Sequence, residues 1–147
     1  MTNKEMTPEV KALVDKAKSE GHRVYSVVIA GEKYIYRSIN RKEFREMQEI
    51  MTGEAETARL ASAKKREELM KNNPDLTENS QEIVKLDYDL EKEAMDIKDK
   101  AEDKLVAVSL IHPVGVSENL PAGVVNNLAE KIMEGSGFQA TEEPEIL

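Results

Sequence analysis

The sequence has no cysteine and no tryptophan, and its aromatic residues are limited to two phenylalanines and four tyrosines among 147 residues. The absence of cysteine excludes disulfides and thiolate metal sites, and it fits a reducing compartment. Because aromatic residues are so few, a core must be built from Val, Ile, Leu, Met and Ala. A chain of this length supports one modest core or two small ones.

Long apolar runs are missing as well. The longest one, Leu105 to Ile111, is interrupted by Ser109 and falls short of the roughly 18–20 apolar residues of a membrane-spanning helix. Residues 1–5 lack the apolar segment of a signal peptide, so we expect no membrane partner and a cytoplasmic location. The net charge of −8 makes nucleic acid an unlikely partner, because phosphate contacts need clustered Lys and Arg.

The first third of the chain predicts a helix, a β-hairpin and a second helix. Thr7-Pro8 is typical of a helix start, and Gly21 is expected to end that helix. Residues 23–39 are rich in Val, Ile and Tyr and predict strands 23–30 and 33–38 joined by a Gly31-Glu32 turn. Asn40 and Glu43 have the spacing of a capping box for the second helix, which Gly53 is expected to end or kink.

The middle of the chain predicts two charged helices. Residues 54–72 have few apolar anchors and indicate a largely solvated helix. A second pattern runs from Thr77 to about His112 and follows an 11-residue repeat, typical of a nearly straight helix about 50 Å long. Its apolar stripe is Ile83, Leu86, Leu90, Ala94, Ile97, Ala101, Leu105 and Val108. Such a helix is longer than a compact domain of this size, so we expect the stripe to pack on residues 54–72 or on another subunit.

The C-terminal region predicts one short helix after Pro121, with Val124, Leu128 and Ile132 on its apolar side and a stop at residues 135–137. The sequence therefore predicts an α+β, mostly α, protein. Its expected parts are a helix–hairpin–helix domain at 1–53, an extended charged helical hairpin at 54–112, a short helix packing on the core at 113–138, and an acidic tail at 139–147.

No combination of residues indicates catalysis. His22 and His112 have no Glu or second His at metal-ligand spacing. The many carboxylates of residues 82–103 alternate with lysines, a pattern typical of a solvated helix face with i,i+4 ion pairs. Because no nucleophile, base and orienting group can be assembled, we predict no catalytic, cofactor-binding or metal-binding residues, no cofactor and no enzyme.

Apolar helix faces rich in methionine favour protein–protein binding, because Met side chains adapt to varied partners. The same side chains could equally be core filler, and both interpretations stay open here. The candidate partner-binding residues are Tyr34, Tyr36, Arg37, Phe44, Met47, Leu86, Leu90, Ile97, Val124, Leu128 and Ile132.

Two stretches resemble a known family when taken together. Residues 25–46 combine a hairpin ending in Tyr-Arg-Ser-Ile with a capped Arg-Lys-Glu-Phe helix. Residues 111–138 combine His-Pro, Leu-Pro-Ala-Gly-Val and Ile-Met-Glu-Gly-Ser-Gly-Phe. This arrangement resembles the small tail and baseplate assembly proteins of tailed bacteriophages, including tail assembly chaperones. The resemblance implies a non-catalytic protein of the host cytoplasm that binds other phage tail proteins, such as the tape-measure protein or the baseplate hub.

Three alternatives follow from the same sequence. The chain could be a permanent structural component of the virion tail or baseplate, or it could form a homo-oligomer through its long helix. It could also be a small nucleic-acid-binding regulator that uses arginines near the hairpin, with tyrosines as stacking platforms. Those residues are Arg23, Arg37, Arg41, Arg45, Tyr25, Tyr34 and Tyr36.

Overall fold

The computed structural model describes residues 6–114, 119–138 and 146. It confirms an α+β protein that is mostly helical. The chain divides into two compact units, Met1–Phe44 with Glu102–Leu147 (unit 1) and Arg45–Ala101 (unit 2). These boundaries differ from the expected ones at 53/54 and 112/113, because the last turns of the long helix belong to unit 1. The expected tail, 139–147, lies outside the described residues except for Ile146.

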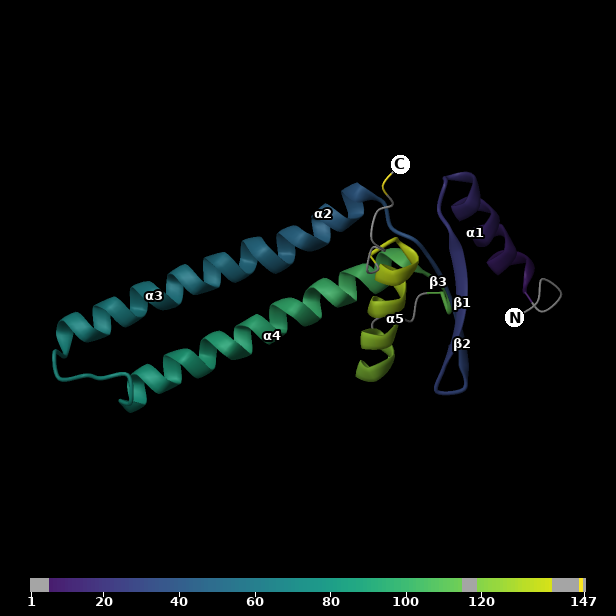
Figure 1. Ribbon diagram of the computed structural model, residues 1–147. Helices are drawn as coiled ribbons and strands as arrows, with labels where there is room; N and C mark the ends of the chain where they lie inside the picture. The colour runs from purple at the N-terminus through teal and green to yellow at the C-terminus, as the bar shows by residue number, and fades with distance from the viewer. Residues whose placement is uncertain (1–5, 115–118, 139–145, 147) are drawn as a thin grey trace. The chain divides into compact units, whose positions relative to one another are not determined.

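Unit 1 is built around a three-stranded antiparallel sheet in the order β1-β2-β3, with β2 in the centre (Figure 1). Its elements are α1 (Pro8–Ser19), β1 (Val24–Ile29), β2 (Glu32–Arg37), the start of α2 (Arg41–Glu49), the end of α4 (Gln81–Ser109), β3 (Leu110–His112) and α5 (Ala122–Gly135). Because β2 is the central strand, its residues Tyr34, Ile35 and Tyr36 are all buried.

The third strand corrects one prediction. The long helix was expected to continue to about His112, but it ends at Ser109, and residues 110–112 pair with β2. In this pairing Ile35 lies opposite His112 and Tyr36 opposite Leu110, with an irregularity between them. The run from Leu105 to Ile111 satisfies helical spacing and strand composition equally well. Pairing with β2, a tertiary contact, decides between the two.

Helices cover both faces of the sheet. On one face α1 contributes Val10, Val14 and Ala17 to a cluster that includes Ile35 and Ile111. On the other face α5 buries an i, i+4, i+8 stripe of Val124, Leu128 and Ile132. The Tyr25 hydroxyl donates a hydrogen bond to the Gly135 carbonyl at 3.1 Å, and a Cβ added at Gly135 would lie 2.7 Å from the Tyr25 ring. The end of α5 therefore lies directly on β1.

The predicted helix ends of unit 1 are confirmed. Thr7 caps α1 through its hydroxyl, which accepts from the Val10 amide, and Gly21 follows the helix with a φ of 89°. Gly137 has a φ of 94° after α5, and the Phe138 amide then donates to the Met133 carbonyl at 3.0 Å. Both ends have the paired hydrogen bonds of the Schellman motif.

The hairpin turn differs from the prediction by one residue. The loop is Ala30-Gly31, not Gly31-Glu32, because Ile29 pairs directly with Glu32. Both loop residues have positive φ, 52° for Ala30 and 81° for Gly31, as a type I′ turn requires. Alanine is a poor choice for this conformation, since its Cβ approaches the following carbonyl oxygen.

Replacing Ala30 with asparagine is therefore expected to stabilise the protein by about 0.5–1 kcal/mol, because Asn tolerates the left-handed conformation far better than Ala does. Urea unfolding measures the change as a higher midpoint with an unchanged slope. Gly31→Ala is the matched control at the adjacent position, and it should lower stability by about 1 kcal/mol or more. A midpoint for Ala30→Asn at or below that of the wild type contradicts the expectation.

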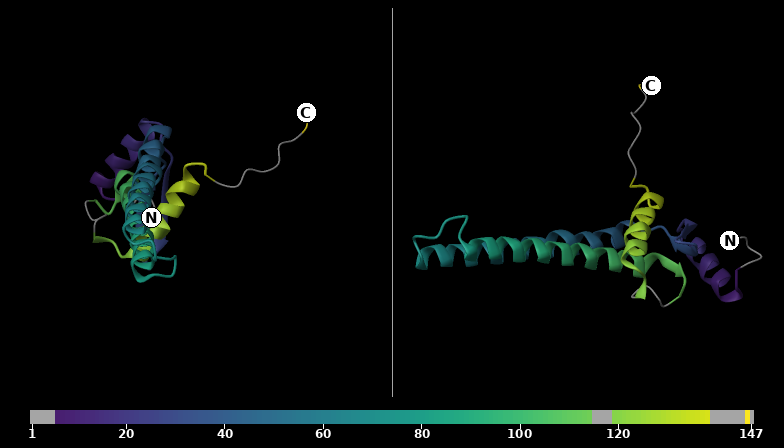
Figure 2. Two further views of the ribbon diagram at one scale, coloured as in Figure 1. Left: turned by 90° about the vertical axis from the view of Figure 1, so that its left-hand side faces the viewer. Right: turned by 90° about the horizontal axis from the view of Figure 1, so that it is seen from below.

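Unit 2 is a helical hairpin. Its first arm is the rest of α2, the π-helical turn η1 (Ile50–Glu54) and α3 (Ala55–Asn72), which follow one another as one uninterrupted helix. Gly53 therefore does not end the helix, and it lies inside the π-helical turn. Residues 73–80 form the connection to α4, whose part up to Ala101 is the second arm. The arms lie side by side in Figures 1 and 2, so residues 54–72 fold back on the long helix within the same chain.

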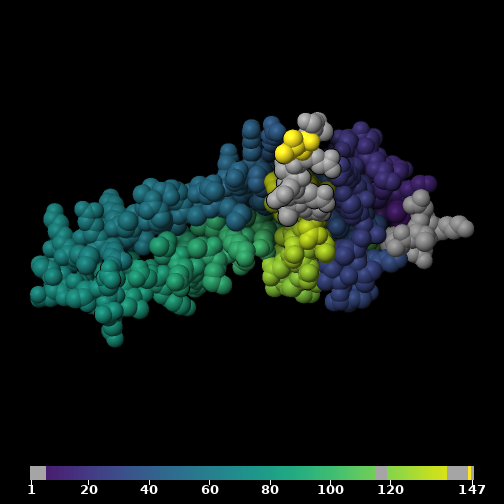
Figure 3. Space-filling view, in the orientation of Figure 1, coloured from purple at the N-terminus to yellow at the C-terminus, as the bar shows by residue number. Residues whose placement is uncertain are grey.

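Few apolar contacts hold the hairpin together. Ion pairs join the arms, from Lys100 to Glu54 and from Arg66 to Asp87, and Arg66 also pairs with Glu78 of the connection. Most of these side chains are well exposed, so the pairs add little stability. The buried residues of unit 2 are Met47, Ala58, Ile83, Ile97 and Ala101. Figure 3 shows the side chains of the two arms in a space-filling view.

Candidate functional site

Seven of the candidate partner-binding residues are buried within the chain itself, counting Ile97 of the long helix, which is described below. Tyr34, Tyr36, Val124, Leu128 and Ile132 lie in the core of unit 1, and Met47 is buried in unit 2. The side chains in the core of unit 1 are covered by other elements of that unit while the fold is intact. Their burial favours the core interpretation for these residues.

Two further candidates are engaged inside unit 1. The Arg37 guanidinium makes a bidentate pair with Glu43, with distances of 2.9 and 2.5 Å, and also donates to the Ser38 carbonyl. The Phe44 ring packs on the ring of Phe138, with centroids 4.4 Å apart, so Phe138 folds back after α5. Because Tyr34 and Tyr36 are buried and Tyr25 stacks on Tyr36, these rings are also not available as platforms for nucleic-acid bases.

The candidates on the long helix are different, because their stripe is incompletely covered. Ile97 is buried, but Leu86 and Leu90 are half-buried and Ala94 is exposed, although all four belong to one apolar stripe. On the first arm, Ala58 and Ala61 line the same groove as Ile97, and their side chains end at Cβ. Side chains this small cannot cover the apolar stripe of α4, which is called the seam below.

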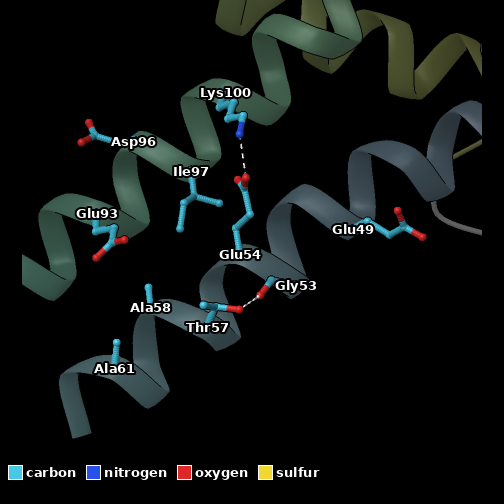
Figure 4. Close-up of a pocket in the computed structure, with 10 residues that line it drawn as sticks. All are labelled: Glu49, Gly53, Glu54, Thr57, Ala58, Ala61, Glu93, Asp96, Ile97 and Lys100. Atoms are coloured by element: carbon cyan, nitrogen blue, oxygen red, sulfur yellow. Dashed lines mark hydrogen bonds and ion pairs between the residues drawn. The ribbon is translucent and has the colours of Figure 1, made fainter. Parts of the chain in front are cut away.

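A groove of about 720 Å³ lies in unit 2 between the two arms. Gly53, Ala58 and Ala61 from the first arm and Ile97 from α4 form its apolar lining (Figure 4). In Figure 4 Ile97 points from α4 toward Ala58, so these two side chains make the floor. The π-helical turn places Gly53 at the groove, and a Cβ added there would meet no atom within 4 Å.

Acidic side chains surround this floor. Glu49 and Glu54 come from the first arm, and Glu93 and Asp96 come from α4, together with a single cation, Lys100. Lys100 donates to Glu54 at 2.6 Å, so those two charges compensate each other. No ion pair or hydrogen bond reaches the carboxylates of Glu49, Glu93 or Asp96 from any residue that the structure describes. The groove is thus an apolar surface with uncompensated negative charge at its rim.

Sequence reasoning found only part of this site. Ile97 was a candidate, whereas Gly53, Ala58, Ala61, Glu93 and Asp96 were not. In the sequence, the small residues indicated a helix with few apolar contacts, and the carboxylates indicated a helix face exposed to solvent. A signal existed, since Ala58 and Ala61 have helical i, i+3 spacing and therefore share a side of the first arm. The side of α4 that they face depends on the hairpin connection and not on either segment alone.

The Arg37–Glu43 pair has an effect on stability that can be measured. Glu43 also accepts from the Asn40 amide at 3.1 Å while Asn40 caps the Glu43 amide at 2.9 Å, which confirms the predicted capping box. The hydrogen bonds from Arg37 are the main reason that the pKa of Glu43 lies below its ordinary value, although burial opposes them. Folding therefore favours the ionised carboxylate.

Because the pKa of Glu43 is lower in the folded than in the unfolded chain, its contribution is present above the unfolded pKa and is lost as the pH falls through the folded pKa. Glu43→Gln is expected to cost about 1–2 kcal/mol at neutral pH, as for a partly buried charged hydrogen bond. The difference from the wild type should shrink in acid. Urea unfolding at several pH values measures this. Glu130→Gln, at an exposed position, is the control, and a Glu43→Gln deficit that is constant with pH contradicts the assignment.

The described residues contain no group of three or more His, Cys, Asp or Glu side chains suited to hold a metal ion. Within the same residues, none of the helices combines the length and the apolar character needed to cross a membrane.

Comparisons of the chain with protein-family models, with curated proteins and with solved structures found no match.

Proposed function

We propose that this chain is a non-catalytic protein-binding protein whose helical hairpin receives a helix of another protein in the groove of unit 2. The observation that carries the proposal is the incomplete burial of the apolar seam of α4. Leu86, Leu90 and Ala94 continue the apolar stripe of Ile97, yet Leu86 and Leu90 are only half-buried and Ala94 is exposed. Leaving a continuous stripe half-covered forgoes the burial energy of about 25 cal/mol per Å² that a third helix would supply.

The geometry of the groove favours a helix as the ligand. Parallel or antiparallel helices pack with their axes 8–10 Å apart, and the closest approach needs small side chains at the contact. Gly53, Ala58 and Ala61 provide such a surface on the first arm. A third helix here would convert the two-helix layer into a three-helix arrangement with a shared core.

The biological setting is proposed from the sequence resemblance. A protein that binds others through a helical hairpin fits a tail or baseplate assembly protein of a tailed bacteriophage, with the tape-measure protein or the baseplate hub as partner. Mass spectrometry of purified particles distinguishes an assembly factor, which would be absent, from a structural virion component, which would be present in stoichiometric amounts.

Photo-cross-linking tests the binding function. A photoreactive amino acid at position 61 lies in the groove, and one at position 63 lies two residues away, on the opposite side of the same helix. We expect irradiation in the native cell lysate to give one discrete cross-linked species from position 61 and none from position 63. Equal cross-linking from the two positions, or none from either, would refute the proposal.

A further inference from the structure

Resting on the proposed function, we infer that the occupant of the groove is a basic amphipathic helix of a different protein. The floor and the rim of the groove define the two faces that such a helix needs. The apolar floor favours an apolar face on the bound helix. The acidic rim favours basic residues on either side of that face.

The floor accepts a closely approaching helix. Ala58 and Ile97 are buried there, and open space surrounds Gly53. Because Gly53, Ala58 and Ala61 have no side-chain atoms beyond Cβ, larger side chains of the incoming helix fit between them. Apolar residues at i, i+3 and i+4 of the occupant would then lie over the continuation of the seam, toward Leu90.

The rim determines the charge of the occupant. A helix on this floor would partly desolvate Glu49, Glu93 and Asp96, and desolvation of an unpaired carboxylate is costly. Lys100 cannot offset this cost because it already pairs with Glu54. Lys or Arg residues beside the apolar face of the occupant would supply the missing partners, whereas Glu or Asp would add repulsion.

The same charges argue against a second copy of this chain. Residues 45–101 contain fifteen Asp and Glu but only ten Lys and Arg. Two hairpins meeting groove to groove would place the unpaired carboxylates of one copy against those of the other. Like charges that face each other across an interface reduce affinity and direct binding toward oppositely charged partners.

The test uses two fluorescein-labelled synthetic peptides of about 21 residues, long enough for six helical turns. Both carry the same Leu and Ala face, with Lys at the flanking positions of one and Glu at those of the other. Fluorescence anisotropy is measured with the full chain at low and at physiological salt. We expect the Lys peptide to bind at least about tenfold more tightly at low salt, with a smaller ratio at higher salt.

Two pairs of variants locate the binding. Replacing Glu93 with Gln together with Asp96 with Asn should weaken the Lys peptide about 5- to 20-fold, as expected for loss of charged contacts. Glu91→Gln, two residues from Glu93 on the opposite side of α4, should leave the affinity unchanged. Ala61→Trp should block the groove, whereas Ala63→Trp should not. Circular dichroism of each variant confirms that the helices are retained.

The outcomes separate this inference from the proposed function. If both peptides bind equally and Ala61→Trp blocks both, the groove binds helices, but the inference of a basic occupant is wrong. If sedimentation shows self-association that Ala61→Trp abolishes, the occupant is a second copy and the inference is again overturned. If neither peptide binds, or if Ala61→Trp has no effect on binding, the inference fails, and the cross-linking result decides the proposed function separately.

Discussion

Leu128→Ala is expected to destabilise unit 1 by about 2–5 kcal/mol, which approaches the whole stability of a small domain. The Leu128 side chain is fully buried, at the centre of the stripe that α5 packs on the sheet. Truncation removes the transfer energy of the lost methyl groups and leaves a cavity that the sheet cannot fill. The strands β1 and β2, which α5 contacts, are held by strand pairing, so they cannot collapse into the space.

Thermal unfolding followed by tyrosine fluorescence measures this effect, because three of the four tyrosines lie in unit 1. Asn127→Ala, at the exposed position next to Leu128, is the control and should change stability by less than about 0.5 kcal/mol. A loss below about 1 kcal/mol for Leu128→Ala would show that α5 is not an integral part of the core.

Local signals predicted the helix boundaries well because each depends on neighbouring residues. The Thr7 cap, the Gly21 and Gly137 stops and the reciprocal Asn40–Glu43 cap are contacts within five residues in sequence. The hairpin was also predictable, although its turn shifted by one residue. Ala30 adopts positive φ because the register places Ile29 opposite Glu32, and register is set by the burial of Tyr36 and Ile35 on opposite faces.

Tertiary contacts account for what the sequence did not predict. Strand β3 exists because β2 offers an edge to residues 110–112, and no local pattern distinguishes those residues from one more helical turn. The burial of Val124, Leu128 and Ile132 on their own sheet could not be distinguished from a partner-binding face for a related reason. An apolar stripe that covers its own sheet has the same composition as one that covers another protein.

The groove depends on which residues of the first arm lie opposite which residues of α4. Neither the Gly53–Ala61 segment nor the segment from Glu93 to Lys100 indicates a site alone, since small residues and charged residues are both ordinary on solvated helices. The hairpin connection brings them together, and the Lys100–Glu54 pair joins the parts that face each other. The unpaired carboxylates are then a consequence of register, which the composition of α4 cannot reveal.

Ile97→Asp is expected to separate the arms of the hairpin while unit 1 stays folded. Ile97 is 9% exposed and is one of only five buried residues in unit 2, so a carboxylate there would be desolvated without a partner. The cost of several kcal/mol is on the order of what so small an apolar seam can supply. Hydrogen exchange of the amides of residues 55–72 and 81–96 should accelerate to rates near those of free helices, whereas the amides of β1 and β2 should keep their protection.

Met95→Asp provides a matched control for this prediction. Met95 lies two residues away on the same helix but is 67% exposed, so the same carboxylate there remains hydrated and should change exchange rates little. The comparison also bears on function, because an open hairpin no longer presents the groove floor. Ile97→Asp should therefore abolish the cross-link from position 61, and Met95→Asp should preserve it. Unchanged protection in Ile97→Asp would mean that the seam does not hold the arms together, and the groove would then lose its structural basis.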